Sequence, residues 1–183
     1  MMALVPCPLL QALLSPLLAS LLALLLARRL GPRTGWLTTA VLAYQVALLA
    51  YSAYSLWCGG GPIVERYAWL AEPPMALELL ADGLSVPVAL IMALVCSCLA
   101  AYSVRYVEHR VRVLYGTGEG PYYTIYYALY PLFPLGLVGI ALSANLMFTW
   151  LFMELLLVPS YFAITYFGYT ERRRVAAMCF FWG

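Results

Sequence analysis

Long apolar runs separated by short charged stretches dominate this chain. Asp, Glu, Lys and Arg are absent from residues 1–27, 34–64, 83–104 and 120–153. Each of these runs is long enough to cross a bilayer, which needs about 20 apolar residues. The fourth exceeds one span, and apolar sequence resumes after Glu154 and continues to Thr170. Two helices must therefore share that region.

Glycine and proline clusters mark the loops between the apolar runs. Gly59 to Pro62 lies in the second loop, and Ser143-Ala144-Asn145 makes so tight a turn that the helices around it must form an antiparallel hairpin. The sequence therefore predicts an all-α fold, a polytopic transmembrane helix bundle formed by a single domain over residues 1–183. The expected spans lie near residues 9–27, 35–57, 84–106, 122–142 and 145–167, followed by the start of a sixth.

Composition agrees with a membrane protein. Hydrophobic residues make up 65% of the chain and charged residues 10%, whereas soluble proteins are about 25% charged. All ten basic residues are arginines, and nine of them follow the first, third and fifth expected spans. Because positive residues are retained on the cytoplasmic side, we expect a multi-pass protein of the plasma membrane with its N-terminus outside. So few and so scattered arginines do not favour a nucleic-acid partner.

Residues 175–183 are apolar and begin where a sixth helix would enter the membrane. At 1.5 Å per residue they reach about 13 Å, less than half of a hydrocarbon core of about 30 Å. This length suggests a fragment, or one half of a split subunit that a second chain completes.

Glu154 is the residue that most plausibly carries function, as a lone carboxylate buried near the middle of the fifth span. It lies roughly 14 Å from the start of that span, close to the midplane of the bilayer. Acidic groups at this depth usually face a bundle interior or a hydrated cavity and mark a proton or ion pathway. Desolvation favours the protonated form of a carboxyl group and a nearby cation favours the ionised form. The alternative is a protonated glutamate that only stabilises helix packing.

Three neighbours of Glu154 are supporting candidates. Pro159 removes the hydrogen bond to the carbonyl of Leu155, which leaves a kink or a free carbonyl near the carboxylate. Trp150 and Tyr161 share a helix face with Glu154. Tyr161 either extends a hydrogen-bonded chain or simply packs in a helix interface. The other tyrosines near span ends are typical of interfacial belts, including Tyr122, Tyr123, Tyr126 and Tyr127.

Other site chemistries are not indicated by the sequence. His109 is the single histidine and is expected in a solvated loop, and the five cysteines show neither metal-ligand nor disulfide spacing. We therefore expect no metal site and no cofactor, including nicotinamide, flavin and iron–sulfur groups. Asp82 precedes the third span and is expected, with Ser85, to satisfy free amides at its start.

Two stretches resemble a known family. Asp-Gly-Leu-Ser-Val-Pro-Val-Ala at residues 82–89 and Leu-Phe-Met-Glu-Leu-Leu-Leu-Val-Pro-Ser-Tyr-Phe-Ala-Ile-Thr-Tyr-Phe-Gly at residues 151–168 are similar to the N-terminal part of the antiporter-like membrane subunits of respiratory complex I. The match is to the chain M family of NADH-quinone oxidoreductase. Related proteins occur in multisubunit sodium/proton antiporters, energy-converting hydrogenases and F420H2 dehydrogenases.

The resemblance implies that Glu154 pairs with a lysine on a later helix, and that this pair modulates a proton path through further lysines and water. This chain contains no lysine, and Cys179 stands where the family usually has one. The resemblance thus implies a non-redox, proton-pumping portion of a NADH-quinone oxidoreductase-type complex, with other membrane subunits as partners. The alternatives are a subunit of a multisubunit sodium/proton antiporter or membrane-bound hydrogenase, and a truncated, purely structural membrane protein.

Overall fold

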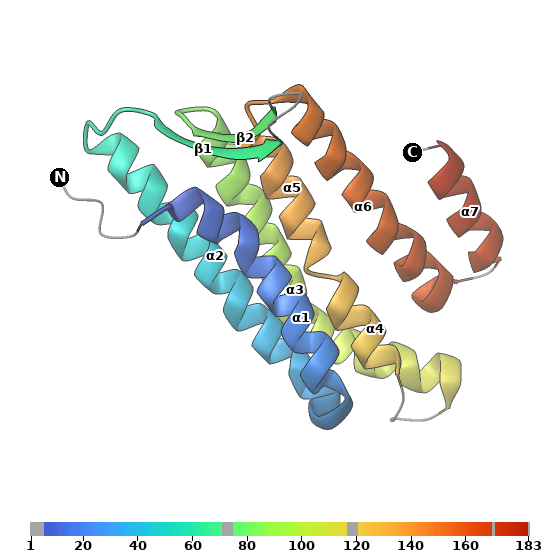
Figure 1. Cartoon of the computed structure of the whole chain (residues 1–183). Helices are drawn as coiled ribbons and strands as arrows, with labels where there is room; N and C mark the ends of the chain where they lie inside the picture. The colour runs from blue at the N-terminus through green and yellow to red at the C-terminus, as the bar shows by residue number, and fades with distance from the viewer. Residues whose placement is uncertain (1–5, 71–74, 117–120, 170, 183) are drawn as a thin grey trace.

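The structure, a computed structural model, describes residues 6–70, 75–116, 121–169 and 171–182 (Figure 1). Within this part, five segments are helical, long and apolar enough to cross a membrane, which confirms the predicted fold class. The elements are α1 (Pro8–Leu30), η1 (Gly31–Arg33), α2 (Thr34–Trp57), β1 (Ile63–Leu70), β2 (Met75–Ala81), α3 (Ser85–Tyr115), α4 (Tyr122–Leu129), α5 (Leu132–Leu142), α6 (Leu146–Phe167) and α7 (Arg172–Trp182). Pro73-Pro74 and residues 117–120, whose prolines and glycines also indicate loops, lie outside the described part.

Two of the helices differ from the predicted spans. The third was expected to end near residue 106, but α3 continues to Tyr115. No proline or glycine lies between residue 106 and Gly116, whose φ of 69° ends the helix. His109 and the arginines at 105, 110 and 112 therefore lie on a helix and not in a loop. The fourth span is built from α4 and α5, which are divided at Tyr130-Pro131 because proline has no N–H to continue the helical ladder.

A two-stranded antiparallel hairpin occupies much of what was expected to be the second loop. β1 and β2 pair with Ile63 opposite Ala81 and Tyr67 opposite Leu77. Leu79 and Ala81 of β2 are fully buried. Figure 1 shows the hairpin lying across one end of the helices, close to the ends of α3 and α5. It therefore closes the bundle at the end opposite most of the arginines.

Hydrogen bonds fix the hairpin to the helices. Glu65 accepts the backbone N–H groups of Leu9 and Leu10, at 3.0 and 2.8 Å, at the start of α1. The Tyr67 hydroxyl donates to the same carboxylate at 3.0 Å. The first amides of a helix lack intrahelical acceptors and lie at its positive end. A carboxylate there both accepts their hydrogen bonds and interacts favourably with the helix dipole.

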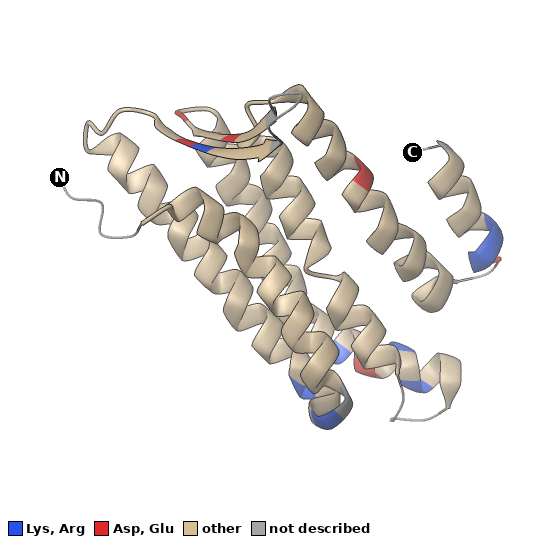
Figure 2. Cartoon of the chain, in the orientation of Figure 1, with Lys and Arg blue, Asp and Glu red and all other residues tan. Residues whose placement is uncertain are grey.

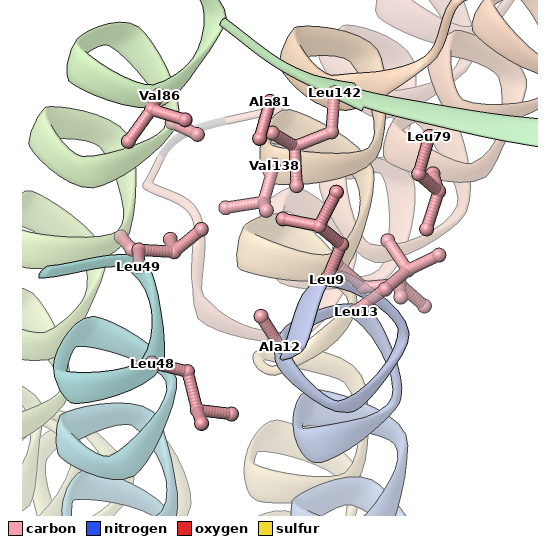
Figure 3. Packing of buried hydrophobic residues seen from close by; sticks show 13 residues of the cluster. Leu9, Ala12, Leu13, Leu48, Leu49, Leu79, Ala81, Val86, Val138 and Leu142 are labelled. Atoms are coloured by element: carbon pink, nitrogen blue, oxygen red, sulfur yellow. The ribbon is translucent and has the colours of Figure 1, made fainter. Parts of the chain in front are cut away.

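The main core joins α1, α2, α3, α5 and the hairpin. Figure 3 shows Leu9, Leu13, Leu49 and Val138 converging from three helices, with no polar group among the labelled side chains. All four are at most 5% exposed. This core holds four of the spanning segments together and leaves α6 at its edge.

Two glycines bring α6 against α5. A Cβ atom on Gly139 would lie 2.6 Å from the ring of Phe152, and one on Gly136 would lie 2.6 Å from Leu156. The remaining surface of α6 is little covered within the described chain, since its buried residues are Phe148, Pro159 and Phe167.

Most of the charged residues lie near the helix ends or in the hairpin (Figure 2). We call the turns α1–α2, α3–α4 and α6–α7, with their arginines, the arginine-bearing end. There, Arg110 donates to the carbonyl oxygens of Phe167 and Gly168 at 3.0 and 2.8 Å. Its guanidinium also stacks on the ring of Tyr169 at 3.9 Å. Arg110 thus satisfies carbonyl groups at the end of α6 and holds α3 beside it.

Replacing Gly139 with alanine should loosen the α5–α6 hairpin, because the added methyl group overlaps the Phe152 ring. Overpacking of this kind costs about 1–3 kcal/mol. Thermal unfolding of the purified chain in detergent should show a lower Tm for Gly139→Ala than for Gly83→Ala, whose added Cβ meets no atom within 4 Å. Equal Tm values would contradict the close packing of these helices.

Replacing Glu65 with glutamine should detach the hairpin from α1, because only one of the two amide contacts keeps an acceptor. Loss of a hydrogen bond to a charged group costs about 1.5–3 kcal/mol. Glu78→Gln is the matched control, since its partner Arg66 is exposed and Glu78 is itself about one-third exposed, and a surface pair of this kind is worth at most about 1 kcal/mol. Urea unfolding should show a larger loss of unfolding free energy for Glu65→Gln than for Glu78→Gln. The reverse order would contradict the role assigned to Glu65.

Candidate functional site

Glu154 lies near the middle of α6, eight residues after Leu146 and thirteen before Phe167. No other residue of this helix is charged. At 1.5 Å per residue the carboxylate is about 12 Å from the nearer helix end. A helix that crosses the bilayer therefore carries its single charge deep in the hydrocarbon.

The side chain of Glu154 is exposed and is not buried among the helices of its own chain. Phe152 and Leu156 face α5, and Glu154, two residues from each, points to the opposite side of the helix. Within the described residues no hydrogen bond or ion pair involves its carboxylate. The groups that would stabilise a charge there must come from outside these residues.

The three supporting candidates divide between two sides of α6. Trp150 is 58% exposed and shares the Glu154 face, as does Tyr161, without a hydrogen bond to the carboxylate among the described residues. Tyr161 packs its ring edge-on against Phe180 of α7, with centroids 5.7 Å apart. The ring of Tyr161 thus packs in the interface between α6 and α7, and a role of its hydroxyl in a hydrogen-bonded chain stays a prediction.

Pro159 lies on the other side of the helix and is buried. It lines a cavity of about 110 Å³ between α4, α5 and α6, together with Tyr126, Tyr130 and Phe162. Since proline has no N–H, it cannot donate to the carbonyl of Leu155. The structure therefore places Pro159 near Glu154 along the chain but not on the same surface.

A groove of about 390 Å³ separates α6 from α7 on the Glu154 side. Its lining is apolar apart from the Tyr161 hydroxyl and comprises Val158, Tyr161, Phe162, Ala177, Phe180 and Phe181. The apolar segment expected to begin a sixth helix is thus helical in α7 and covers the part of this face beyond Glu154.

Asp82 has the predicted structural role. Its carboxylate accepts the N–H groups of Leu84 and Ser85 at 2.9 and 2.7 Å, and the Ser85 hydroxyl accepts the N–H of Asp82 at 2.9 Å. Donation from the Ser85 and Leu84 amides holds the pKa of the Asp82 carboxyl below its usual range. Among the described residues no three His, Cys, Asp or Glu side chains group as metal ligands would.

The tyrosines of α4 were interpreted from sequence as an interfacial belt, but two of them face the protein interior. Tyr123 is 2% exposed and Tyr127 is fully buried. Their spacing of four residues, continued by Tyr130, was the signal for one buried helix face. The sequence alone did not show that other helices cover this face.

No family model matches the chain, but comparison with curated proteins finds several relatives of one kind. Chain 4 of the NAD(P)H-quinone oxidoreductase of Synechococcus sp. (strain JA-3-3Ab) is 31% identical over 144 residues, which are 77% of this chain and 25% of that protein. The corresponding protein of Trichodesmium erythraeum is 29% identical over 149 residues, 80% of this chain and 24% of its own length. The chain thus spans about a quarter of the length of the curated relatives it matches.

A solved structure, that of the Mrp complex from Dietzia sp. DQ12-45-1b, has the same fold over 92% of this chain and 17% of the matched one, with a TM-score of 0.69 and 24% identity. The sequence relatives confirm the resemblance predicted from residues 82–89 and 151–168. This multi-pass membrane chain is therefore a homologue of the chain 4 subunits of NAD(P)H-quinone oxidoreductases, which are antiporter-like membrane subunits of complex I.

Proposed function

We propose that this chain forms part of a proton-translocating, non-redox membrane subunit of a complex I-like quinone oxidoreductase. The observation that carries the proposal is the single carboxylate of Glu154 in the middle of a membrane-spanning helix. Insertion of an acidic residue at this depth costs about 2.5–3.5 kcal/mol. A protein retains such a group where it has a task and a partner, and proton exchange is the task that suits a carboxyl group.

The exposed Glu154 face of α6 supports an assembly with other membrane subunits. A cation on a helix of such a subunit would stabilise the ionised carboxylate, and movement of that cation would favour protonation. Proton uptake and release at Glu154 would then follow changes elsewhere in the complex. The arginine-bearing end would lie in the cytoplasm, with the N-terminus outside and the plasma membrane as the location.

A second candidate is a subunit of a multisubunit sodium/proton antiporter. The fold shared with a chain of the Mrp complex favours it. The two candidates assign the same role to Glu154 and differ in the energy source, which is quinone reduction in the first and an ion gradient in the second.

Neutralising Glu154 should abolish proton pumping and leave assembly intact, because glutamine has a similar shape but cannot exchange a proton. The measurement is quinone-reductase-driven acidification of inverted membrane vesicles, with assembly followed on native gels. Glu171→Gln, at the exposed pair with Arg174, is the matched control and should pump normally. Full pumping by assembled Glu154→Gln would refute the role of this carboxylate, and acidification driven by sodium alone would favour the antiporter.

A photo-crosslinking residue in place of Met153, which is 54% exposed beside Glu154, should capture a separate polypeptide in native membranes. Mass spectrometry should locate the linked residue in a membrane helix that carries lysine or arginine. The same probe in place of Phe152, which faces Gly139, should link only within this chain. Capture of lipid alone at residue 153 would argue against a partner subunit on this face.

A further inference from the structure

Three consecutive arginines begin α7 at the arginine-bearing end. Arg172, Arg173 and Arg174 line an open pocket of about 530 Å³ together with Tyr169 and Glu171. We call it the basic pocket. Figure 2 shows its positive charges at the start of α7. Because the lining carries three positive charges and one negative charge, the pocket attracts anions.

Two of these arginines are available to a ligand. Arg172 donates to the carbonyl of Tyr166 at 3.2 Å and so joins α7 to α6. Arg174 pairs with Glu171 at 3.6 Å, but both side chains are largely exposed, and such a pair is weak. Arg173 is exposed and has no hydrogen bond or ion pair to any described residue. The guanidinium groups of Arg173 and Arg174 can therefore turn toward a bound anion.

The apolar groove between α6 and α7 begins one turn further along α7. Arg173, Ala177 and Phe180 follow at intervals of four and three residues, and Arg174, Ala177 and Phe181 at intervals of three and four. Residues at these spacings share a helix face. Ala177, Phe180 and Phe181 line the groove. An apolar surface thus follows directly on the positive one, on the same side of α7.

The depth of this groove corresponds to one leaflet of a bilayer. Val158, its deepest lining residue on α6, lies nine residues before Phe167, where that helix ends. At 1.5 Å per residue this is about 14 Å, close to half of a hydrocarbon core of about 30 Å. Glu154 lies one turn deeper and does not line the groove. The groove therefore suits an acyl chain of the nearer leaflet and leaves Glu154 accessible to a partner helix.

We propose that the basic pocket and the groove together bind one phospholipid with an anionic headgroup. Arg173 and Arg174 bind its phosphate, because the planar guanidinium group matches phosphate oxygens. An acyl chain lies in the groove against Phe180 and Phe181. Basic pockets between membrane helices recognise anionic headgroups. A free phosphate would account only for the positive charge and a partner helix only for the apolar lining, whereas a lipid accounts for both. The proposal does not depend on the role of Glu154.

Native mass spectrometry of the purified chain in detergent tests the headgroup contact. Dioleoyl phosphatidylglycerol should bind several-fold more tightly than dioleoyl phosphatidylcholine, which has the same chains and no net charge. Arg173→Gln/Arg174→Gln should abolish this preference. Arg29→Gln/Arg33→Gln is the matched control, since it removes the same charge from two exposed arginines at the same end, and it should keep the preference. Equal binding of the two lipids, or equal losses in the two double variants, would overturn the headgroup site.

A larger side chain in the groove tests the acyl-chain contact by the same measurement. Ala177→Phe should weaken phosphatidylglycerol binding several-fold, because the added ring occupies the groove. Val175→Phe adds the same ring on the other side of α7, where Val175 is 43% exposed, and should bind normally. Normal binding by Ala177→Phe would contradict the acyl-chain site. Displacement of the lipid by an equal concentration of inorganic phosphate would rule out a lipid as the specific ligand.

Phosphatidylglycerol with a diazirine in its acyl chain tests the occupant in native membranes. Photolysis should label residues 158–162 and 177–181, and Arg173→Gln/Arg174→Gln should lose this labelling while Arg29→Gln/Arg33→Gln keeps it. If a helix of another subunit fills the groove, neither segment is labelled and the proposal fails. Because no variant in these experiments alters Glu154, this failure would leave the proposed function untouched.

Discussion

The hydrocarbon core of the bilayer offers no hydrogen-bond partners, and this constraint governs the structure. Helices satisfy their own backbone groups except at their ends. This chain covers several of those ends with polar side chains. Glu65 accepts amides at the start of α1, Asp82 accepts amides at the start of α3, and Arg110 donates to carbonyls at the end of α6. Each of these devices joins two elements, so satisfying the backbone also assembles the bundle.

Polar groups that remain without partners inside the spans are the candidates for function, because the same constraint makes them costly. In the described chain Glu154 lies exposed on the outer face of α6 without a hydrogen bond or ion pair. This carboxylate calls for a partner from outside these residues.

Much of the fold follows from where charge is absent. The gaps between charged residues located all five spans, and Ser143-Ala144-Asn145 correctly separated the last two. The hairpin was missed because residues 63–81 mix apolar and charged residues, and a loop between spans has the same composition. The arginines of α3 were predicted to lie in a loop, because charged residues indicate the end of a membrane span. The helix instead continues past that point. The turn at Tyr130-Pro131 was not predicted, because these residues were assigned to the interior of one span.

The site was less predictable because the surroundings of a side chain depend on other helices. Spacing along the sequence placed Trp150 and Tyr161 on the Glu154 face, but whether that face is covered depends on segments beyond α6. For Tyr127, an interfacial belt and a buried face have the same local sequence. Gly35, 92 positions earlier in the chain, decides between them because it leaves space for the tyrosine hydroxyl.

The two faces of α6 restrict where a partner for Glu154 can lie. Phe152 and Leu156 face α5 and Pro159 lines the cavity beside α4, whereas Glu154 points away from α5. A partner group must therefore approach from the side that the described residues leave exposed. Pro159 has no N–H to donate to the Leu155 carbonyl, so this oxygen is a hydrogen-bond acceptor one residue after Glu154. Disruption of α6 at this point thus gives the helix a second polar group next to the carboxylate along the chain.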